Sequence, residues 1–230
     1  MKKRNQDIKI SETFFATSMI QFGRYWAETG MKDIPIDWII LEETTDHYFI
    51  VSKQAIVSKM FGYGMNDWSG SDIRTWLNHE FMEAAFDYYE RSCLIDKEIT
   101  TTNDPYLTWG GKSRTPMIKS VESNDKVFLL STHEVEKYFK EKESRIVEFS
   151  QYAVDTLGDN TDLLGVWWLR NEEELGWGPM SILSDGSYDG EYKSSDDNPI
   201  ILAGVRPAIY IKKAYFERIP HPDQMHLFDK

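Results

Sequence analysis

The segment between residues 166 and 211 constrains the fold more than any other part of this chain. It holds two apolar runs, Trp167-Trp168-Leu169-Arg170 and Gly204 to Ile211, separated by a polar stretch rich in Gly, Ser and Asp. Short apolar runs bounded by turn-forming residues predict buried strands. The C-terminal part of the chain is therefore expected to consist of strands and turns.

Similar apolar runs occur earlier in the chain. They predict a hairpin from residues 35–41 and 48–52, with the polar residues 42–47 as its turn. Pro207 within the last apolar run indicates an edge strand or a bulge. In chain order, strands are predicted over residues 19–25, 35–41, 48–52, 127–130, 167–170, 179–183 and 203–212.

Helical spacing is clearest after Ser71, which suits an N-cap and is followed by Asp72 in the first turn. Apolar residues then recur at helical spacing to about Arg91. A second helix is predicted to be capped by Thr132 and to end near Phe139, and a third covers residues 144–154. Residues 100–124 are rich in turn-forming residues and predict a long loop.

Composition limits the domain organisation and the kinds of partner. With 230 residues we expect one domain over residues 19–212, a flexible segment 1–18 and a tail 213–230. A net charge of −12 argues against direct binding to nucleic acid. Cys93 is the sole cysteine, which suits a reducing compartment, and no run suggests a membrane span or a signal peptide. We therefore expect a cytoplasmic protein that makes no membrane contact.

Seven sequence blocks, taken together and in order, resemble an uncharacterised bacterial domain family over roughly residues 19–212. The blocks end in the Trp-Trp-Leu-Arg and Gly-Val-Arg-Pro-Ala segments. They are Phe22-Gly23-Arg24-Tyr25, Pro35-Ile36-Asp37-Trp38, Val51-Ser52-Lys53, Arg74-Thr75-Trp76-Leu77-Asn78, Val127 to Ser131, Trp167 to Arg170, and Gly204 to Ala208.

The last two blocks also resemble the C-type-lectin-like fold. That fold is shared by formylglycine-generating enzymes and by the variable receptor-binding proteins of diversity-generating retroelements. The resemblance implies a compact α+β domain with a twisted antiparallel sheet and two or three helices. It does not carry over the copper chemistry of the enzymes, because that chemistry needs a pair of cysteines and this chain has only Cys93. A buried, inert thiol is the expected state of Cys93.

No catalytic motif is recognisable in the chain. None of the five histidines has a metal-ligand spacing such as His-Glu-x-x-His, and no Gly-x-Ser-x-Gly elbow is present. The leading hypothesis is therefore a binding module of bacterial or phage origin, without enzymatic activity, for a protein or a small-molecule ligand. The aromatic ligand-binding candidates lie in the loop 100–124 and the polar segment 171–198, and are Tyr106, Trp109, Trp177, Tyr188 and Tyr192.

Two arginines in the family blocks, Arg170 and Arg206, are further ligand-binding candidates. The structural alternative is that each guanidinium bridges strands, stacks on Trp167 or Trp168 and pairs with a carboxylate. A second hypothesis makes the protein an enzyme with an unfamiliar site. Its polar groups would be Arg74, Asn78, Arg170 and Arg206, if they converge on one pocket.

One short acidic segment has the spacing of a calcium loop. Oxygen-bearing side chains fall at positions 1, 3, 5 and 12, and Gly190 follows at position 6. The flanking segments are predicted strands rather than helices, so an acidic hairpin is the competing interpretation. The candidate calcium ligands are Asp185, Ser187, Asp189 and Asp196, and no other cofactor is predicted.

The C-terminal Gln224-Met225-His226-Leu227-Phe228 resembles the short peptides by which bacterial replication and repair proteins dock on the DNA sliding clamp. Gln224 would be the amide anchor, and Leu227 and Phe228 the apolar contacts. The alternative is that Leu227 and Phe228 pack back on the domain. The third functional hypothesis is accordingly an accessory protein recruited to the sliding clamp.

Overall fold

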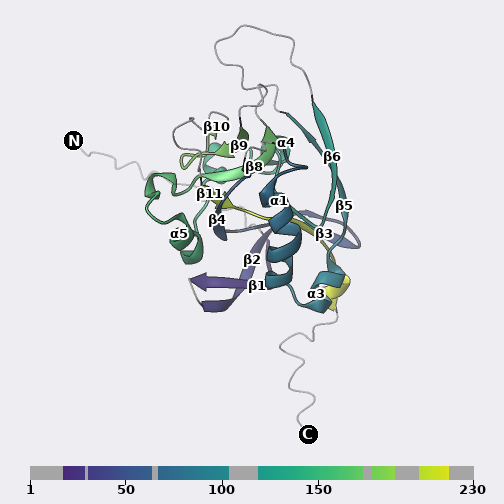
Figure 1. Ribbon diagram of the computed structural model, residues 1–230. Helices are drawn as coiled ribbons and strands as arrows, with labels where there is room; N and C mark the ends of the chain where they lie inside the picture. The colour runs from purple at the N-terminus through teal and green to yellow at the C-terminus, as the bar shows by residue number, and fades with distance from the viewer. Residues whose placement is uncertain are drawn as a thin grey trace, which may run out of the picture.

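The computed structural model of the chain describes residues 18–28, 31–63, 67–103, 119–172, 178–189 and 202–217 (Figure 1). The first sheet has the strand order β1-β2-β3-β12-β7, with every neighbouring pair antiparallel. The predicted hairpin is confirmed as β2 and β3. The strands are β1 (Met19–Glu28), β2 (Met31–Glu43), β3 (His47–Ser52), β12 (Ala208–Lys212) and β7 (Val127–Phe128).

A second sheet has the order β10-β9-β8-β11-β4. Its pairs are antiparallel except β8 and β11, which run parallel where Trp167 faces Gly204. The strands are β10 (Tyr188–Asp189), β9 (Pro179–Ile182), β8 (Trp167–Glu172), β11 (Leu202–Val205) and β4 (Val57–Met60).

The two sheets share one bent ribbon of two strands. β3 pairs with β12 in the first sheet, and their continuations β4 and β11 pair in the second. The backbone N–H of Ser52 donates to Pro207 at 2.9 Å, and that of Ile56 donates to Val205 at 3.0 Å, on either side of the bend. The prediction of one strand over residues 203–212 is therefore wrong. Arg206 and Pro207 carry the chain from one sheet to the other, and proline has no N–H with which to continue a ladder.

Gly204 sits where the ribbon passes closest to its neighbours. A Cβ there would lie 2.6 Å from the Phe149 ring and 2.8 Å from the Ala55 methyl group. Phe149 forms an isolated bridge with Ala55, and residues 146–149 are not helical. The predicted helix over 144–154 is therefore wrong in its first part and confirmed only from residue 151 onward. Lys142–Arg145 forms a 3₁₀ turn, and the helix α5 (Gln151–Leu157) begins only after the N-cap Ser150.

The longest helical segment begins as predicted, with the Ser71 side chain accepting from the Arg74 N–H. It runs through α1 (Asp72–Trp76), the π turn η1 (Leu77–Phe81) and α2 (Met82–Ala85). The prediction that it continues to Arg91 is wrong. Asp87 forms a capping box with Glu90 and starts the separate helix α3 (Tyr88–Cys93).

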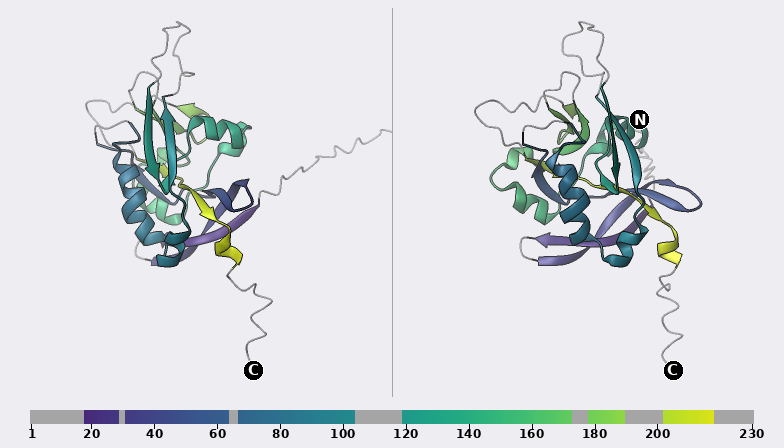
Figure 2. Two further views of the ribbon diagram at one scale, coloured as in Figure 1. Left: turned by 90° about the vertical axis from the view of Figure 1, so that its right-hand side faces the viewer. Right: turned by 45° about the vertical axis from the view of Figure 1, so that its right-hand side comes forward.

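The predicted loop over residues 100–124 is partly wrong. The two ends of this segment belong to strands. β5 (Lys97–Thr102) and β6 (Ser120–Asp125) pair with each other as an antiparallel hairpin. Only one face of this hairpin is covered, and Ile99 and Thr101 are its buried residues on β5. Because so few positions are apolar, the alternation is weak in the sequence. Figure 2 shows the hairpin standing beside the α1–α2 helix.

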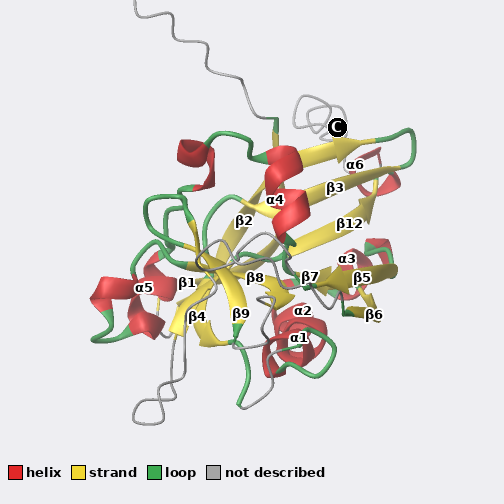
Figure 3. Ribbon diagram, turned by 90° about the horizontal axis from the view of Figure 1, so that it is seen from above, coloured by secondary structure: helices red, strands yellow, loops and turns green. Residues whose placement is uncertain are grey.

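The remaining helices pack against the two sheets. α4 (Thr132–Tyr138) is capped by Ser131 rather than by the predicted Thr132. Figure 3 shows α4 lying across the first sheet and α5 beside β1 and β4. The short turns are η4 (Thr161–Leu163) and α6 (Ala214–Glu217).

One hydrophobic core joins the sheets and helices, and its largest fully buried side chains include Trp38, Trp68 and Trp167. The predicted α+β class with antiparallel sheets and few helices is confirmed. Cys93 is buried and forms no disulfide. In the described part of the chain, no helix is long and apolar enough to cross a membrane.

Candidate functional site

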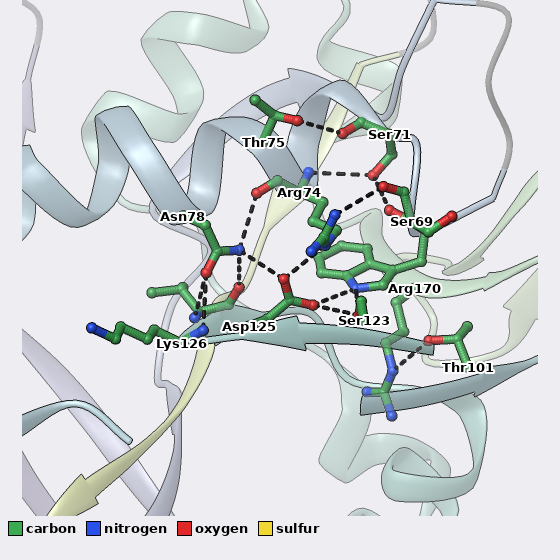
Figure 4. A network of polar contacts seen from close by, with 12 residues as sticks. Ser69, Ser71, Arg74, Thr75, Asn78, Thr101, Ser123, Asp125, Lys126 and Arg170 are labelled. Carbon is green, nitrogen blue, oxygen red and sulfur yellow. Dashed lines mark hydrogen bonds and ion pairs between the residues drawn. The ribbon is translucent and has the colours of Figure 1, made fainter. Parts of the chain in front are cut away.

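A buried carboxylate, Asp125, gathers polar side chains from the α1 region and the β5–β6 hairpin (Figure 4). Arg74 Nε donates to one oxygen at 2.7 Å. Trp68 Nε1 and the Ser123 hydroxyl donate to the other, at 2.9 and 2.6 Å. The Asp125 side chain is wholly excluded from solvent. Both oxygens of the buried carboxylate therefore accept hydrogen bonds, and one of them also forms an ion pair with Arg74.

Asn78 fixes the step from β6 to β7. It lies in the π turn η1, a widened helical turn that re-aims side chains. Its Oδ1 accepts from the backbone N–H groups of Lys126 and Val127 at 3.0 and 3.1 Å. Its Nδ2 donates to the Val127 carbonyl at 2.8 Å. Arg74 and Asn78 thus hold the hairpin against the helix.

Arg170 lies on β8, and only 4% of the residue is exposed. Nε donates to the Thr101 hydroxyl at 3.2 Å, and Nη1 donates to the Leu129 carbonyl at 2.7 Å. The same Nη1 forms an ion pair with Glu134. Glu134 also accepts from the N–H of Ser131 at 2.7 Å, so the pair joins β8 to the start of α4.

Arg206 lies between β11 and β12, where the chain passes from the second sheet to the first, and it is 2% exposed. Its guanidinium lies 4.9 Å from the Phe139 ring centre and 5.1 Å from that of Trp167. Nε donates to the Ser52 carbonyl at 2.8 Å. No carboxylate of the described residues pairs with it, and burial lowers the pKa of Arg206 to about 9. Of the four polar candidates for an enzyme site, Arg74 and Asn78 meet at Asp125, whereas Arg170 and Arg206 contact other groups.

A small pocket lies where three connections of the chain begin or end. We call it the junction pocket. Asp67 borders residues 64–66, Asn103 and Lys119 border residues 104–118, and Glu172 borders residues 173–177. Its volume is about 10 Å³, and its lining residues are Asp67, Trp68, Thr101, Asn103, Lys119, Val121 and Glu172.

Charge and hydrogen bonding hold the rim of the junction pocket together. Lys119 Nζ lies 3.6 Å from Glu172 Oε1 and 4.0 Å from Asp67 Oδ2. The N–H of Lys119 donates to Asn103 Oδ1 at 2.8 Å. A hydrogen bond from Ser69 is the main cause of a lowered pKa at Asp67, so this carboxylate stays charged. The ends of the three connections are therefore fixed relative to one another.

The calcium candidates Asp185 and Ser187 lie in the turn between β9 and β10. Asp185 Oδ2 accepts from Lys142 Nζ at 2.7 Å. Asp185 Oδ1 accepts from the backbone N–H of Ser187 at 3.0 Å. Asp189 is in β10, and Asp196 lies outside the described residues. Calcium binding stays a prediction. It requires the melting temperature to rise in millimolar calcium, and an unchanged temperature would contradict it.

Among the aromatic candidates, Tyr188 is half-buried, with the Arg145 guanidinium 4.6 Å from its ring centre. The other candidates lie outside the described residues. They are Tyr106, Trp109, Trp177 and Tyr192, together with the tail residues Gln224, Leu227 and Phe228.

Sequence reasoning missed the centre of the polar network. Trp68 and Asp125 are 57 positions apart, and no local pattern joins them. The one signal was the spacing of Ser123 and Asp125, two polar residues on the same face of a strand. That signal was hidden because the segment was predicted to be a loop.

The protein is thus an α+β domain with two mainly antiparallel sheets. A bent two-stranded ribbon, formed by β3–β4 and β11–β12, runs through both sheets. The chain belongs to the family described as domain of unknown function (DUF6273), which matches residues 37–213. The match begins within β2 and ends directly after β12, and it confirms the predicted uncharacterised domain family. No curated protein and no solved structure matches the chain significantly.

Proposed function

We propose that the protein is a binding module whose ligand surface is carried by the connections that start at the junction pocket. The observation that carries this proposal is the meeting of three connections at one charged pocket. Two of them contain the aromatic candidates Tyr106, Trp109 and Trp177. Loops anchored on a rigid scaffold are the usual place for binding residues, and aromatic rings supply large contact areas.

The anchoring of these ends supports a binding surface rather than a catalytic centre. Trp68 lines the junction pocket and donates to Asp125, which also accepts from Arg74 of the helix. Within the described residues, the strongest polar groups of this region are thus engaged in holding the hairpin. The ligand is proposed to be a protein or a small molecule that contacts the aromatic residues.

The C-type-lectin-like assignment remains part of the proposal. In its support, the two blocks that carry the resemblance are neighbours, since Trp167 of β8 faces Gly204 of β11. A cytoplasmic location is likewise proposed, and the single buried thiol of Cys93 supports it. Recruitment to the sliding clamp through Gln224 and Phe228 is supported only by the sequence, because both residues lie outside the described part of the chain.

The test uses the full chain labelled with 5-fluorotryptophan, which gives a separate ¹⁹F signal for each of the eight tryptophans. Random peptides selected on the protein by display, and a library of small aromatic fragments, serve as probes. We expect bound probes to shift the signals of Trp109 and Trp177, and the paired Trp109→Ser and Trp177→Ser substitutions to weaken binding at least tenfold. The proposal fails if the probes leave both signals unchanged or if the paired variant binds equally well.

A further inference from the structure

A second cavity lies away from the junction pocket, between the β1–β2 hairpin and the start of α5. In Figure 1, β1 and β2 lie at the bottom of the view, whereas β6 rises toward the top. The cavity has a volume of about 110 Å³. This is well below the roughly 300–1,000 Å³ of sites for drug-sized ligands, so it suits a single small head group. Its lining includes Tyr25, Trp26, Ile36, Asp37, Gln54 and Ser150.

Neighbouring aromatic residues of β1 both reach this cavity. Adjacent side chains of a regular strand point to opposite faces, but the pairing of β1 with β2 shifts register between Tyr25 and Trp26. Such irregularities bend a strand and re-aim side chains, and they are frequent beside binding sites. Both rings also pack on Tyr152, with centroid distances of 5.8 and 6.0 Å. Contacts with Tyr152 therefore stabilise the positions of both rings.

A carboxylate lies beside this aromatic wall. Asp37 is exposed, and its Oδ1 accepts from Gln21 Nε2 at 3.0 Å. In the described part of the chain it forms no ion pair, which distinguishes it from Asp125 and Glu134. Burial is the main cause of the raised pKa of Tyr25, so its phenol stays neutral and the negative charge of the site comes from Asp37.

We propose that this cavity binds an organic cation with a head group the size of a methylated ammonium. The rings of Trp26 and Tyr25 line the cavity, aromatic rings attract a cation through their negative π surfaces, and Asp37 supplies the opposite charge. The net charge of −12 favours the approach of cations to the protein. Pro35 and Ile36 provide the apolar contact that methyl groups require. This inference is independent of the proposed binding surface, which involves other residues.

The experiment compares cations with a neutral molecule of the same shape. Tetramethylammonium and choline are titrated into the full chain at matched ionic strength, and 3,3-dimethylbutan-1-ol replaces choline as the uncharged control. The ¹⁹F signal of Trp26 reports binding. We expect both cations to shift it, with the alcohol binding about 5- to 30-fold more weakly because it lacks the cation–π and charge attraction. N-acetyl-trimethyllysine amide in a further arm shows whether the head group can also belong to a protein side chain.

Two substitutions and a matched control complete the test. Asp37→Asn removes the charge at an exposed position without changing the size of the side chain, and we expect it to weaken choline binding by about 2- to 5-fold, the range of an exposed ion pair. Trp26→Leu lacks the ¹⁹F reporter, so its binding is followed by calorimetry; it should reduce the difference between choline and the alcohol, since only Tyr25 and Asp37 then favour the cation. Glu136→Gln removes one charge from an exposed position on α4 and should leave binding unchanged.

Several results would overturn the proposal. They are equal binding of choline and the alcohol, unchanged choline binding by Asp37→Asn, no shift of the Trp26 signal by either cation, and displacement of choline by methyl glucoside. The last result would assign the cavity to a sugar. Because Asp37 is exposed, its variant tests the proposal even if Trp26→Leu fails to fold. Failure here would leave the Trp109 and Trp177 signals, and therefore the proposed function, unaffected.

Discussion

Replacing Asn78 by Ala tests whether the Arg-x-Trp-Leu-Asn block holds the fold together. The substitution removes three hydrogen bonds to the backbone of Lys126 and Val127, with lengths from 2.8 to 3.1 Å. A hydrogen bond contributes a net ~0.5–1.5 kcal/mol. Alanine recovers roughly 0.5 kcal/mol through its higher helix propensity. With the central value of about 1 kcal/mol for each of the three bonds, we therefore expect the free energy of unfolding to fall by about 2–3 kcal/mol.

The assay is urea unfolding followed by tryptophan fluorescence and far-UV circular dichroism. His79→Ala is the matched control, since His79 is the next residue of the same π turn and its side chain is exposed. Exposed substitutions usually change stability by less than about 0.5 kcal/mol. For a domain of this size the melting temperature should fall by about 4–12 °C in Asn78→Ala.

Asn78→Asp separates the roles of the two side-chain atoms. The aspartate keeps an oxygen that can accept from the N–H groups of Lys126 and Val127. It loses the donor to the Val127 carbonyl, and it places a second negative charge where Asn78 Nδ2 now lies 3.4 Å from Asp125 Oδ1. We expect it to be at least as destabilising as the alanine at neutral pH. If either variant were as stable as His79→Ala, the conclusion that Asn78 holds the hairpin against the helix would be refuted.

Three further predictions concern the other junctions. Gly204→Ala should lower the free energy of unfolding by about 1–3 kcal/mol, because its Cβ overlaps the neighbouring ring and methyl group; a neutral effect in urea unfolding would contradict this packing. Arg170→Met should cost about 3–5 kcal/mol by leaving Glu134 without its cation, and adding Glu134→Gln should restore part of the loss; strict additivity would argue against the pair. Hydrogen bonds from Lys142, the larger cause, and from Ser187 hold the pKa of Asp185 below its ordinary 3.8. The Asp185 carboxylate therefore stabilises the folded state above pH 3.8, and this contribution is lost as the pH falls through the lowered pKa. Lys142→Met should raise the Asp185 pKa in an NMR titration, and an unchanged value would exclude Lys142 as the cause.

The parts of the fold that follow from the sequence are those set by local chemistry. Ser71 caps a helix because its hydroxyl reaches the N–H of Arg74, three residues away. The β2–β3 hairpin follows from apolar runs on either side of a polar turn. The parts that failed are decided by distant partners. Residues 146–149 leave the helical path because Phe149 pairs with Ala55, and no local propensity contains that information.

The candidate sites were predictable to a smaller extent, for the same physical reason. Arg74 and Asn78 were identified as polar residues worth attention, but their common partner Asp125 lies some fifty positions further along the chain. The structural alternative predicted that Arg206 stacks on Trp167 or Trp168, and its guanidinium does lie over the ring of Trp167. It also predicted a carboxylate partner, and none of the described residues supplies one.

Residues of the Arg-x-Trp-Leu-Asn, Trp-Trp-Leu-Arg and Gly-Val-Arg-Pro-Ala segments share a structural role, so these three segments are more informative about the fold than about a ligand. Asn78 fixes the step from β6 to β7, Arg170 joins β8 to α4, and Gly204 and Arg206 lie at the switch between the sheets. Each acts where two elements meet. Asn78 and Arg170 bond mainly to backbone groups and interior side chains, whereas Nη1 of Arg206 is buried without a hydrogen-bond partner among the described residues. A substitution at these positions would lower stability and impair any activity indirectly. Binding assays are therefore informative only with substitutions that leave these junctions intact. Asp37 meets that condition, because its side chain is exposed and outside the junctions.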